Sequence, residues 1–227
     1  MSVALAIFVK TPELSPIKTR LANTIGKELA VKFYIRSLKA TAAMVNAMTT
    51  KIDELEIFWA VAEMEGLKSE YWNEFMVIGQ GTGSLGERLS FVYDELIQKH
   101  DAVFFIGADS PHLDYLKLVE EIKSLDNNDF IIGETDDGGF YLFGGTRPLP
   151  KSTWTSVEYS VDSTSSHLCQ NLKQLGQLTY ISKSFDIDEF DDFSKYEASN
   201  FLTDHLLPEQ KNIIEWIKNH IRIKNEI

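Results

Sequence analysis

The chain has 227 residues, of which 44% are hydrophobic and 25% are charged, and its formal net charge is −12. This length and composition predict one domain, spanning residues 1–227, with a substantial core. A surface this acidic repels nucleic acid and anionic membranes, so a small phosphorylated ligand held by a few local cations is favoured as partner. The single cysteine excludes an internal disulfide and a cysteine-rich zinc site.

The sequence also bears on the compartment. No apolar run approaches the roughly 18 residues of a membrane span. The apolar segment Val3–Val9 has neither a basic leader nor a small-residue cleavage site, which is not typical of a signal peptide. We therefore expect a cytoplasmic protein without a membrane span. Nothing in the sequence indicates an oligomeric state.

Short apolar runs alternate with helical segments over most of the chain. In chain order, strands are expected at 3–9, 55–62, 75–78, 103–106, 130–132, 140–143 and 178–181, and helices at 27–48, 85–99, 113–125, 162–175 and 209–224. This alternation predicts an α/β fold with a mostly parallel central sheet and helices on both faces.

The strand at 103–106 has an acid directly beyond its end. Gly107 closes the apolar run, and Asp109, Ser110 and Pro111 follow. Ligands of open α/β sheets bind beyond the carboxyl ends of the strands. Asp109 could hold a divalent cation there, and the cation could hold phosphate. The alternative is that Asp109 or Ser110 only caps a helix that starts near Pro111.

The loop after the first strand carries Lys10, Lys18 and Arg20 in an otherwise acidic protein. In an extended loop, Lys18 and Arg20 would point the same way. Such cations can neutralise a diphosphate, and arginine can bind it through two hydrogen bonds. The loop has no dinucleotide-binding glycine pattern and no P-loop motif. The alternative is a solvated basic loop with ordinary ion pairs.

A second segment, 80–88, leads into the helix predicted at 85–99. Ser84 and Glu87 have the spacing of a capping box. Free N–H groups at a helix N-terminus favour an anion or a base edge, and Arg88 in the first turn opposes the helix dipole. We expect Gln80, Gly81 and Arg88 to lie near the base or ribose of a nucleotide. The alternative is a well-capped loop with a surface arginine.

A third segment, 134–144, joins two acids to a pair of glycines. Asp137 could complete a cation site, orient a hydroxyl or act as a base. Gly138 and Gly139 allow another group to approach the backbone closely, and we expect them to face the acceptor of a transfer reaction. The alternative is a tight turn, because Asp-Gly and Gly-Gly are turn formers.

A fourth segment, 185–193, is rich in acids. Asp186 and Asp188 share a side if the segment is extended, so one of them could join Asp109 on a hard cation. We take Asp188 as this second candidate metal ligand. The later acids are expected to cap the following helix.

These segments resemble one family when they are taken together and in order. The motifs are Lys10-Thr-Pro with Lys18-Thr-Arg-Leu21, Gln80-Gly with Leu85-Gly-Glu-Arg88, Ile106-Gly-Ala-Asp-Ser-Pro111, and Asp137-Gly-Gly-Phe-Tyr-Leu-Phe-Gly144. Over roughly residues 3–200 they are similar to bacterial glycosyltransferase-like proteins of uncharacterised function, some of them associated with radical-SAM and selenoprotein gene clusters. The resemblance implies a Rossmann-like GT-A fold, a nucleotide-diphospho-sugar donor, and Mg²⁺ or Mn²⁺ as cofactor.

The chain departs from the family pattern at three places. Ser15-Pro16 stands where Pro-Gly is common, and Ser84 stands where aspartate is common. Tyr159-Ser160-Val161 replaces an expected Trp-Ser-Thr element. The last change puts the acceptor-side contacts of the family in doubt.

The function predicted from the sequence is a metal-dependent glycosyltransferase-like enzyme with an open choice of acceptor. Asp137 would be its catalytic residue, and Asp109 with Asp188 would hold the metal. A nucleotidyltransferase acting on a small phosphorylated substrate is the first alternative, because it uses the same architecture and Lys-Thr-Arg-Leu also occurs in guanylyltransferase-like relatives. A non-catalytic nucleotide-binding module is the second.

Overall fold

The computed structural model describes residues 1–199 and 205–225, and its strands form one seven-stranded sheet in the order β3-β2-β1-β4-β6-β5-β7. The strands are β1 (Val3–Val9), β2 (Leu55–Val61), β3 (Met76–Gly79), β4 (Ala102–Gly107), β5 (Phe130–Glu134), β6 (Phe140–Gly145) and β7 (Leu178–Tyr180). The α-helices are α1 (Thr19–Ile25), α2 (Lys27–Met48), α3 (Leu85–Ile97), α4 (Tyr115–Lys123), α5 (Lys151–Thr155), α6 (Thr164–Lys173), α7 (Asp192–Ser199) and α8 (Pro208–Asn225).

The sheet is mostly parallel, as the sequence predicts. β1 pairs in parallel with β2 and β4, β2 with β3, and β5 with β7, whereas β6 runs antiparallel to both β4 and β5. All strands except β6 therefore run in one direction, and their carboxyl ends meet at one edge of the sheet. The chain leaves β1 toward β2 on one side and reaches β4 on the other, so the strand order reverses between β1 and β4.

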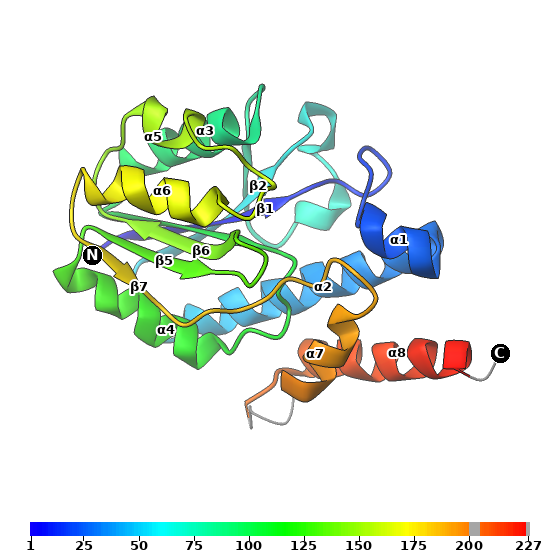
Figure 1. Cartoon of the computed structure of the whole chain (residues 1–227). Coiled ribbons are helices and arrows are strands. Elements are labelled where there is room, and N and C mark those ends of the chain that lie inside the picture. Colours follow the sequence, from blue (N-terminus) through cyan, green and yellow to red (C-terminus); the bar gives the residue numbers. More distant parts are fainter. Residues whose placement is uncertain (200–204, 226–227) are drawn as a thin grey trace.

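Helices cover both faces of the sheet (Figure 1). Leu5 and Ile7 of β1 face a core formed with α2 and α4, and Ala4 and Ala6 face a second core formed with α3, α5 and α6. Both faces of β1 are thus removed from water, which explains why its sequence is apolar throughout instead of alternating.

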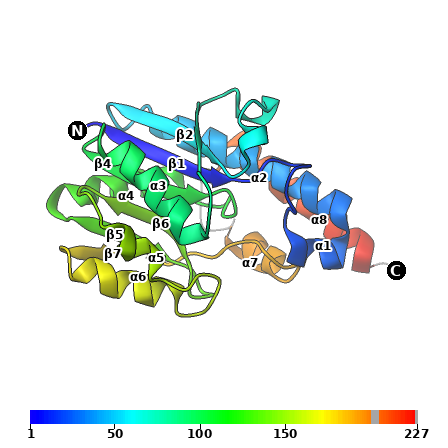
Figure 2. The same ribbon diagram turned by 90° about the horizontal axis from the view of Figure 1, so that it is seen from above.

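The C-terminal part of the chain packs against α1 and α2 in a third hydrophobic cluster beside the sheet. Figure 2 shows α8 running along α2. Phe33 of α2 packs against Phe193 of α7 and Trp216 of α8. This cluster anchors the segment that follows β7. Ile187 in that segment is fully buried, and its N–H donates to the carbonyl of Asp109 at 3.0 Å. The neighbours of Ile187 are thereby held at the end of β4.

Some predicted boundaries are wrong for local reasons. The helix expected from residue 113 begins at Tyr115, because the side chain of Asp114 accepts a hydrogen bond from Leu116 N–H and caps it there. Asp109 and Ser110 therefore cap no helix. The predicted loop up to residue 20 already contains the start of α1, and α5 and α7 are additional short helices. No helix in residues 1–199 and 205–225 is long and apolar enough to span a membrane.

Candidate functional site

Every segment singled out from the sequence follows the carboxyl end of a parallel strand. Lys10 follows β1, Gln80 follows β3, Asp109 follows β4, Asp137 follows β5, and Asp188 lies in the segment after β7. The reversal of strand order between β1 and β4 is the place where open α/β sheets bind ligands. The fold thus brings residues far apart in sequence to one edge of the sheet.

At this edge Lys18 lies between two aspartates. Its Nζ is 2.8 Å from Oδ1 of Asp109 and 2.6 Å from Oδ1 of Asp188. The lysine side chain is only 5% exposed, whereas those of Asp109 and Asp188 are 43% and 41% exposed. Burial by itself would lower the pKa of Lys18, but the two carboxylates outweigh burial and raise it. The ammonium therefore stays charged, and we call these three residues the Lys18 triad.

The Lys18 triad bears directly on the predicted metal site. Asp109 and Asp188 converge on one point, as expected of two ligands of a hard cation, but the ammonium of Lys18 occupies that point. No group of three or more His, Cys, Asp or Glu side chains in the described part of the chain is arranged to hold a metal ion. Each carboxylate remains partly open to solvent and offers oxygen, the ligand that Mg²⁺ prefers. The donor set thus fits a divalent cation if Lys18 moves aside.

The backbone around Lys18 explains its position. Lys18 has left-handed dihedral angles, with φ 43° and ψ 54°, immediately before α1 begins at Thr19. Ile17 and Leu21 are buried on either side of it, so the turn directs the Lys18 side chain inward. The expectation that Lys18 and Arg20 lie in an extended loop is wrong, because Arg20 belongs to the first turn of α1.

A cavity of about 820 Å³ opens beside the Lys18 triad, and we call it the basic cavity. Its charged lining residues are Lys10, Lys18, Arg20, Arg88, Glu63, Asp109 and Asp188. Cations outnumber carboxylates here, although the whole chain carries a net charge of −12. Within the described residues, the side chains of Lys10 and Arg20 have no ion pair, so their charge is available to an anion. The cavity therefore suits a phosphorylated ligand.

Gln80 and Arg88 line the basic cavity, but the backbone holds both of them. The Gln80 amide donates to the carbonyl of Ala60 at 2.8 Å and to that of Val9 at 3.3 Å. Arg88 donates from Nη1 to the carbonyl of Ala62 and from Nε to that of Gly83, each at 3.1 Å. The guanidinium of Arg88, which opposes the helix dipole, is thus held by backbone carbonyls of the chain itself. Gly81, which has a φ of 73°, is not among the lining residues.

The capping box at the start of α3 is confirmed. The side chain of Ser84 accepts from Glu87 N–H at 3.4 Å, and Glu87 Oε2 accepts from Ser84 N–H at 3.0 Å. Lys151 pairs with the same glutamate at 3.2 Å. A carboxylate of the chain itself therefore occupies the position near the helix N-terminus where the sequence suggested a ligand anion. Ser84 also performs the capping role that the aspartate common in the resembled family would perform.

Ser84→Ala is expected to lower the free energy of unfolding by about 1 kcal/mol, because it removes one half of this capping box. Ser84→Thr keeps a capping hydroxyl that can also donate to Glu87 Oε2, so its unfolding free energy should remain within about 0.5 kcal/mol of the parent value. Urea unfolding followed by circular dichroism measures both. Equal losses for the two variants would show that the cap contributes nothing specific.

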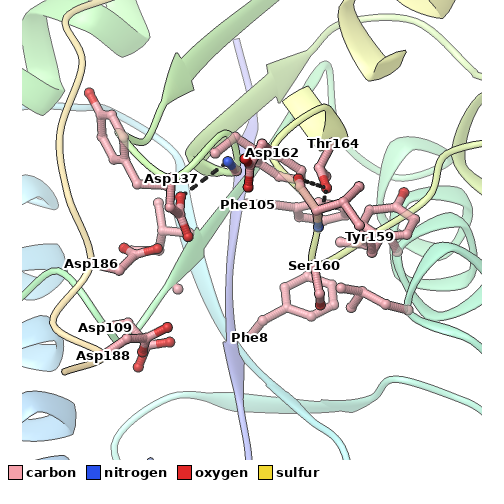
Figure 3. Close-up of a pocket in the computed structure, with 18 of the residues that line it drawn as sticks. Phe8, Phe105, Asp109, Asp137, Tyr159, Ser160, Asp162, Thr164, Asp186 and Asp188 are labelled. Carbon is pink, nitrogen blue, oxygen red and sulfur yellow. Dashed lines mark hydrogen bonds between the residues drawn. The ribbon is translucent and has the colours of Figure 1, made fainter. Parts of the chain in front are cut away.

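A second cavity, of about 410 Å³, adjoins the first, and we call it the acidic cavity. Its charged lining residues are Asp109, Asp137, Asp162, Asp186, Asp188 and Arg20. Figure 3 shows the carboxylates of Asp109, Asp186 and Asp188 on one side and the ring of Phe8 on the other. Tyr159, Ser160 and Val161, the element that departs from the family pattern, also line it. Asp109, Asp188 and Arg20 belong to both cavities, which meet at the Lys18 triad.

Asp137 and Gly139 line the acidic cavity, while Gly138 supports its wall. Asp137 Oδ1 accepts from the Thr135 hydroxyl at 2.5 Å and from Gly139 N–H at 3.2 Å, which is the tight turn held open as an alternative. This turn fixes an exposed carboxylate at the cavity. Gly138 has a φ of 84° and lies against the backbone of Asp162. The group that approaches Gly138 closely is therefore the chain itself.

Asp186 also lines the acidic cavity, although the sequence favoured Asp188 over it as the second metal ligand. Its Oδ1 accepts a hydrogen bond of 2.5 Å from the Ser110 hydroxyl. Burial, together with the nearby carboxylate of Asp109, raises the pKa of Asp186 to about 7. The alternation of Asp186, buried Ile187 and Asp188 was the available signal, since it places both acids on the side opposite an apolar anchor.

This pKa predicts a pH-dependent difference between the parent and Asp186→Asn. The native pKa of about 7 lies above the usual value near 4, so the native state binds more protons than the unfolded state between them. The parent should therefore lose stability as the pH rises through this window. Because asparagine does not ionise, the stability of the variant relative to the parent should increase by about 4 kcal/mol between about pH 4 and about pH 8. Urea unfolding across this range in EDTA measures it, and a pH-independent difference would contradict the expectation.

Three solved structures share the fold. A proposed nucleotide-diphospho-sugar transferase from Desulfovibrio desulfuricans superposes with a TM-score of 0.81 at 20% identity, covering 98% of each chain. CMP-2-keto-3-deoxy-manno-octonic acid synthetase, solved with CTP, gives 0.52 at 9% identity over 89% of this chain and 99% of the other. The 4-diphosphocytidyl-2C-methyl-D-erythritol synthase of Anaerococcus prevotii gives 0.55 at 12% identity over 88% and 96%. At these identities the likeness establishes the fold alone.

Comparison at the level of sequence identifies a family. No curated protein sequence matches the chain. One family profile matches residues 43–161, which is more than half of the 227 residues and includes Gln80, Asp109 and Asp137. The chain belongs to the bacterial family described as "Uncharacterized protein conserved in bacteria (DUF2064)".

Proposed function

We propose that the protein is a transferase that takes a nucleotide-diphospho-sugar as donor and passes the sugar to an acceptor in the acidic cavity. The observation that carries this proposal is the pair of adjoining cavities with opposite charge, which meet at Asp109, Asp188 and Arg20. A donor of this class has an anionic half and an uncharged sugar half. The fold that the chain shares with a proposed nucleotide-diphospho-sugar transferase supports the same class.

The cations of the basic cavity would bind the donor's diphosphate. Among the described residues Lys10 and Arg20 have no ion-pair partner, and Arg20 lines both cavities, so it would lie close to the bond between diphosphate and sugar. Gln80 and Arg88 also line this cavity, and their part of the wall would hold the ribose or the base. Because the backbone holds Arg88 and the Gln80 amide, these residues would form a rigid surface instead of closing around the ligand.

Mg²⁺ or Mn²⁺ is the proposed cofactor, and Asp109 and Asp188 would hold it. When bound, such an ion supplies positive charge that stabilises the leaving diphosphate. On the acceptor side, Asp137 would orient the attacking hydroxyl or accept its proton, since the turn at Thr135 and Gly139 holds its carboxylate at the acidic cavity. The aromatic wall that includes Phe8 and Tyr159 would provide an apolar surface for the acceptor.

A nucleotidyltransferase is the second candidate, and the shared fold of two cytidylyl-transferring enzymes favours it. Such an enzyme would join a nucleoside triphosphate to a small phosphorylated substrate. The second phosphate would then lie in a cavity lined by five aspartates and a single arginine. Like charges repel at such short range, so the acidic cavity favours an uncharged or cationic acceptor and hence the sugar transferase.

The released product distinguishes the candidates. Purified protein is incubated with Mn²⁺ and a panel of sugar nucleotides or nucleoside triphosphates, together with pooled uncharged, cationic and phosphorylated acceptors. Release of a nucleoside diphosphate from a sugar nucleotide supports the proposal, whereas release of pyrophosphate from a triphosphate supports the nucleotidyltransferase. Binding without turnover of any activated donor would favour the non-catalytic module.

A further inference from the structure

We propose that Lys18 is the resident counter-cation of Asp109 and Asp188 and competes with a divalent cation for them, so that metal loading requires its ammonium to move into the basic cavity. The inference rests on the proposed cation site but not on sugar transfer. It assigns Lys18 a role in coupling metal binding to nucleotide binding.

The contacts of the Lys18 triad place the ammonium on the oxygens that a divalent cation would use. Oδ1 of Asp109 and Oδ1 of Asp188 both contact Nζ of Lys18, at 2.8 and 2.6 Å. A Mg²⁺ or Ca²⁺ ion binds carboxylate oxygen at about 2.0–2.6 Å. An ion on these same oxygens would lie within a few ångström of the ammonium and repel it. The ammonium and a divalent cation therefore cannot share these two Oδ1 atoms without a large electrostatic cost.

The charges of the Lys18 triad also favour exchange of the ammonium for a divalent ion. One ammonium between two carboxylates leaves a local charge of −1, and adding a divalent ion beside the ammonium would change it to +1. Replacing the ammonium by a divalent ion leaves the pair neutral instead. A divalent ion therefore neutralises the two carboxylates only if it replaces the ammonium. Because salt screens partly buried charges only weakly, breaking the contacts of Lys18 with both aspartates costs free energy in the protein without nucleotide.

The basic cavity gives the Lys18 ammonium a place to move to. The backbone at this residue is fixed between buried Ile17 and Leu21, but Lys18 also lines the basic cavity of about 820 Å³. Its four-carbon stem allows the ammonium to swing into that space without moving α1. A diphosphate in the cavity would receive the displaced charge. Metal and nucleotide should therefore each increase the affinity for the other, as reciprocal coupling requires.

Mn²⁺ binding in the absence of nucleotide tests this role. Electron paramagnetic resonance counts free Mn²⁺ during titration of the parent, Lys18→Met and Lys10→Met. Lys18→Met removes the competing ammonium, so it should bind Mn²⁺ at least about tenfold more tightly than the parent. Lys10→Met removes an equal charge from the same cavity without touching Asp109 or Asp188, and its affinity should change by less than about threefold. Adding Asp188→Asn to Lys18→Met should abolish the gain.

A second measurement needs no variant. In the parent, the buried ammonium of Lys18 should be protected from amine-reactive labelling, and saturating Mn²⁺ should increase its labelling several-fold while leaving Lys10 unchanged. Equal Mn²⁺ affinity of parent and Lys18→Met, both shown to be folded by thermal melts, would overturn the proposal, as would unchanged Lys18 labelling. Because no donor is present, a protein without transferase activity can still pass this test, and an active transferase can fail it.

Discussion

Asp109→Asn is expected to abolish most of the metal-dependent nucleotide binding while leaving the fold intact. Asp109 contributes one of the two carboxylates that hold a cation at the reversal of strand order, so its loss should weaken nucleotide binding in Mn²⁺ at least about tenfold. The side chain is 43% exposed, and Lys18 keeps Asp188 as a partner. The melting temperature should therefore change by only a few degrees at most. Isothermal titration of nucleoside diphosphate into protein plus Mn²⁺ measures the binding.

A matched control separates this effect from a general loss of charge. Asp53→Asn removes one negative charge from an exposed residue in the connection between α2 and β2, far from the sheet's carboxyl edge. Its titration should match that of the parent. If Asp109→Asn also binds metal and nucleotide like the parent, then Asp109 is not part of the site, and the assignment of Asp188 fails with it.

Gly138→Ala is expected to destabilise the protein strongly. An added β-carbon at Gly138 would collide with the backbone carbonyl of Asp162, and the φ of 84° is one that side chains rarely adopt. Neither the turn nor the segment at 160–165 can yield without disturbing the hydrogen bond from Ser165 N–H to Gly138, so we expect a loss of about 3 kcal/mol in the free energy of unfolding. Urea unfolding measures this loss.

Gly26→Ala is the matched control for the backbone effect. Gly26 has a nearly identical φ of 88°, but nothing lies within 4 Å of an added β-carbon. Its substitution should therefore cost only the backbone conformation at φ 88° and ψ 153°, a region that residues other than glycine rarely adopt, on the order of 1–2 kcal/mol and less than the loss expected for Gly138→Ala. Similar losses for the two variants would mean that the chain gives way easily around Gly138 and that the wall of the acidic cavity is soft.

The general location of the site follows from the sequence because local patterns determine where strands end. The apolar runs before Lys10, Asp109 and Asp137 mark strands, and in a parallel sheet their carboxyl ends meet at one edge. The capping box of Ser84 and Glu87 is local as well, which explains why it could be predicted residue by residue.

The partners of the site residues depend on tertiary structure and could not be predicted. Lys18 and Asp188 are 170 positions apart, and they meet because the C-terminal helices anchor Ile187 beneath the end of β4. The left-handed backbone at Lys18 has no glycine or asparagine to signal it. The sequence predicts Arg88 near the base or ribose of a nucleotide, but it does not predict that its guanidinium donates to the carbonyl of Ala62, which only the folded chain brings near it.

The most direct test of the nucleotide site is a thermal-shift screen of nucleoside diphosphates and sugar nucleotides, with and without Mn²⁺, on the parent and Arg20→Met. At about one hundred times the dissociation constant, a ligand adds roughly 2.7 kcal/mol, which corresponds to a rise in melting temperature of about 5 °C or more for a chain of this size. We predict such a rise for at least one of these diphosphates with Mn²⁺ in the parent, and a much smaller one in Arg20→Met. No rise with any of them, or an equal rise in both proteins, would contradict diphosphate binding in the basic cavity.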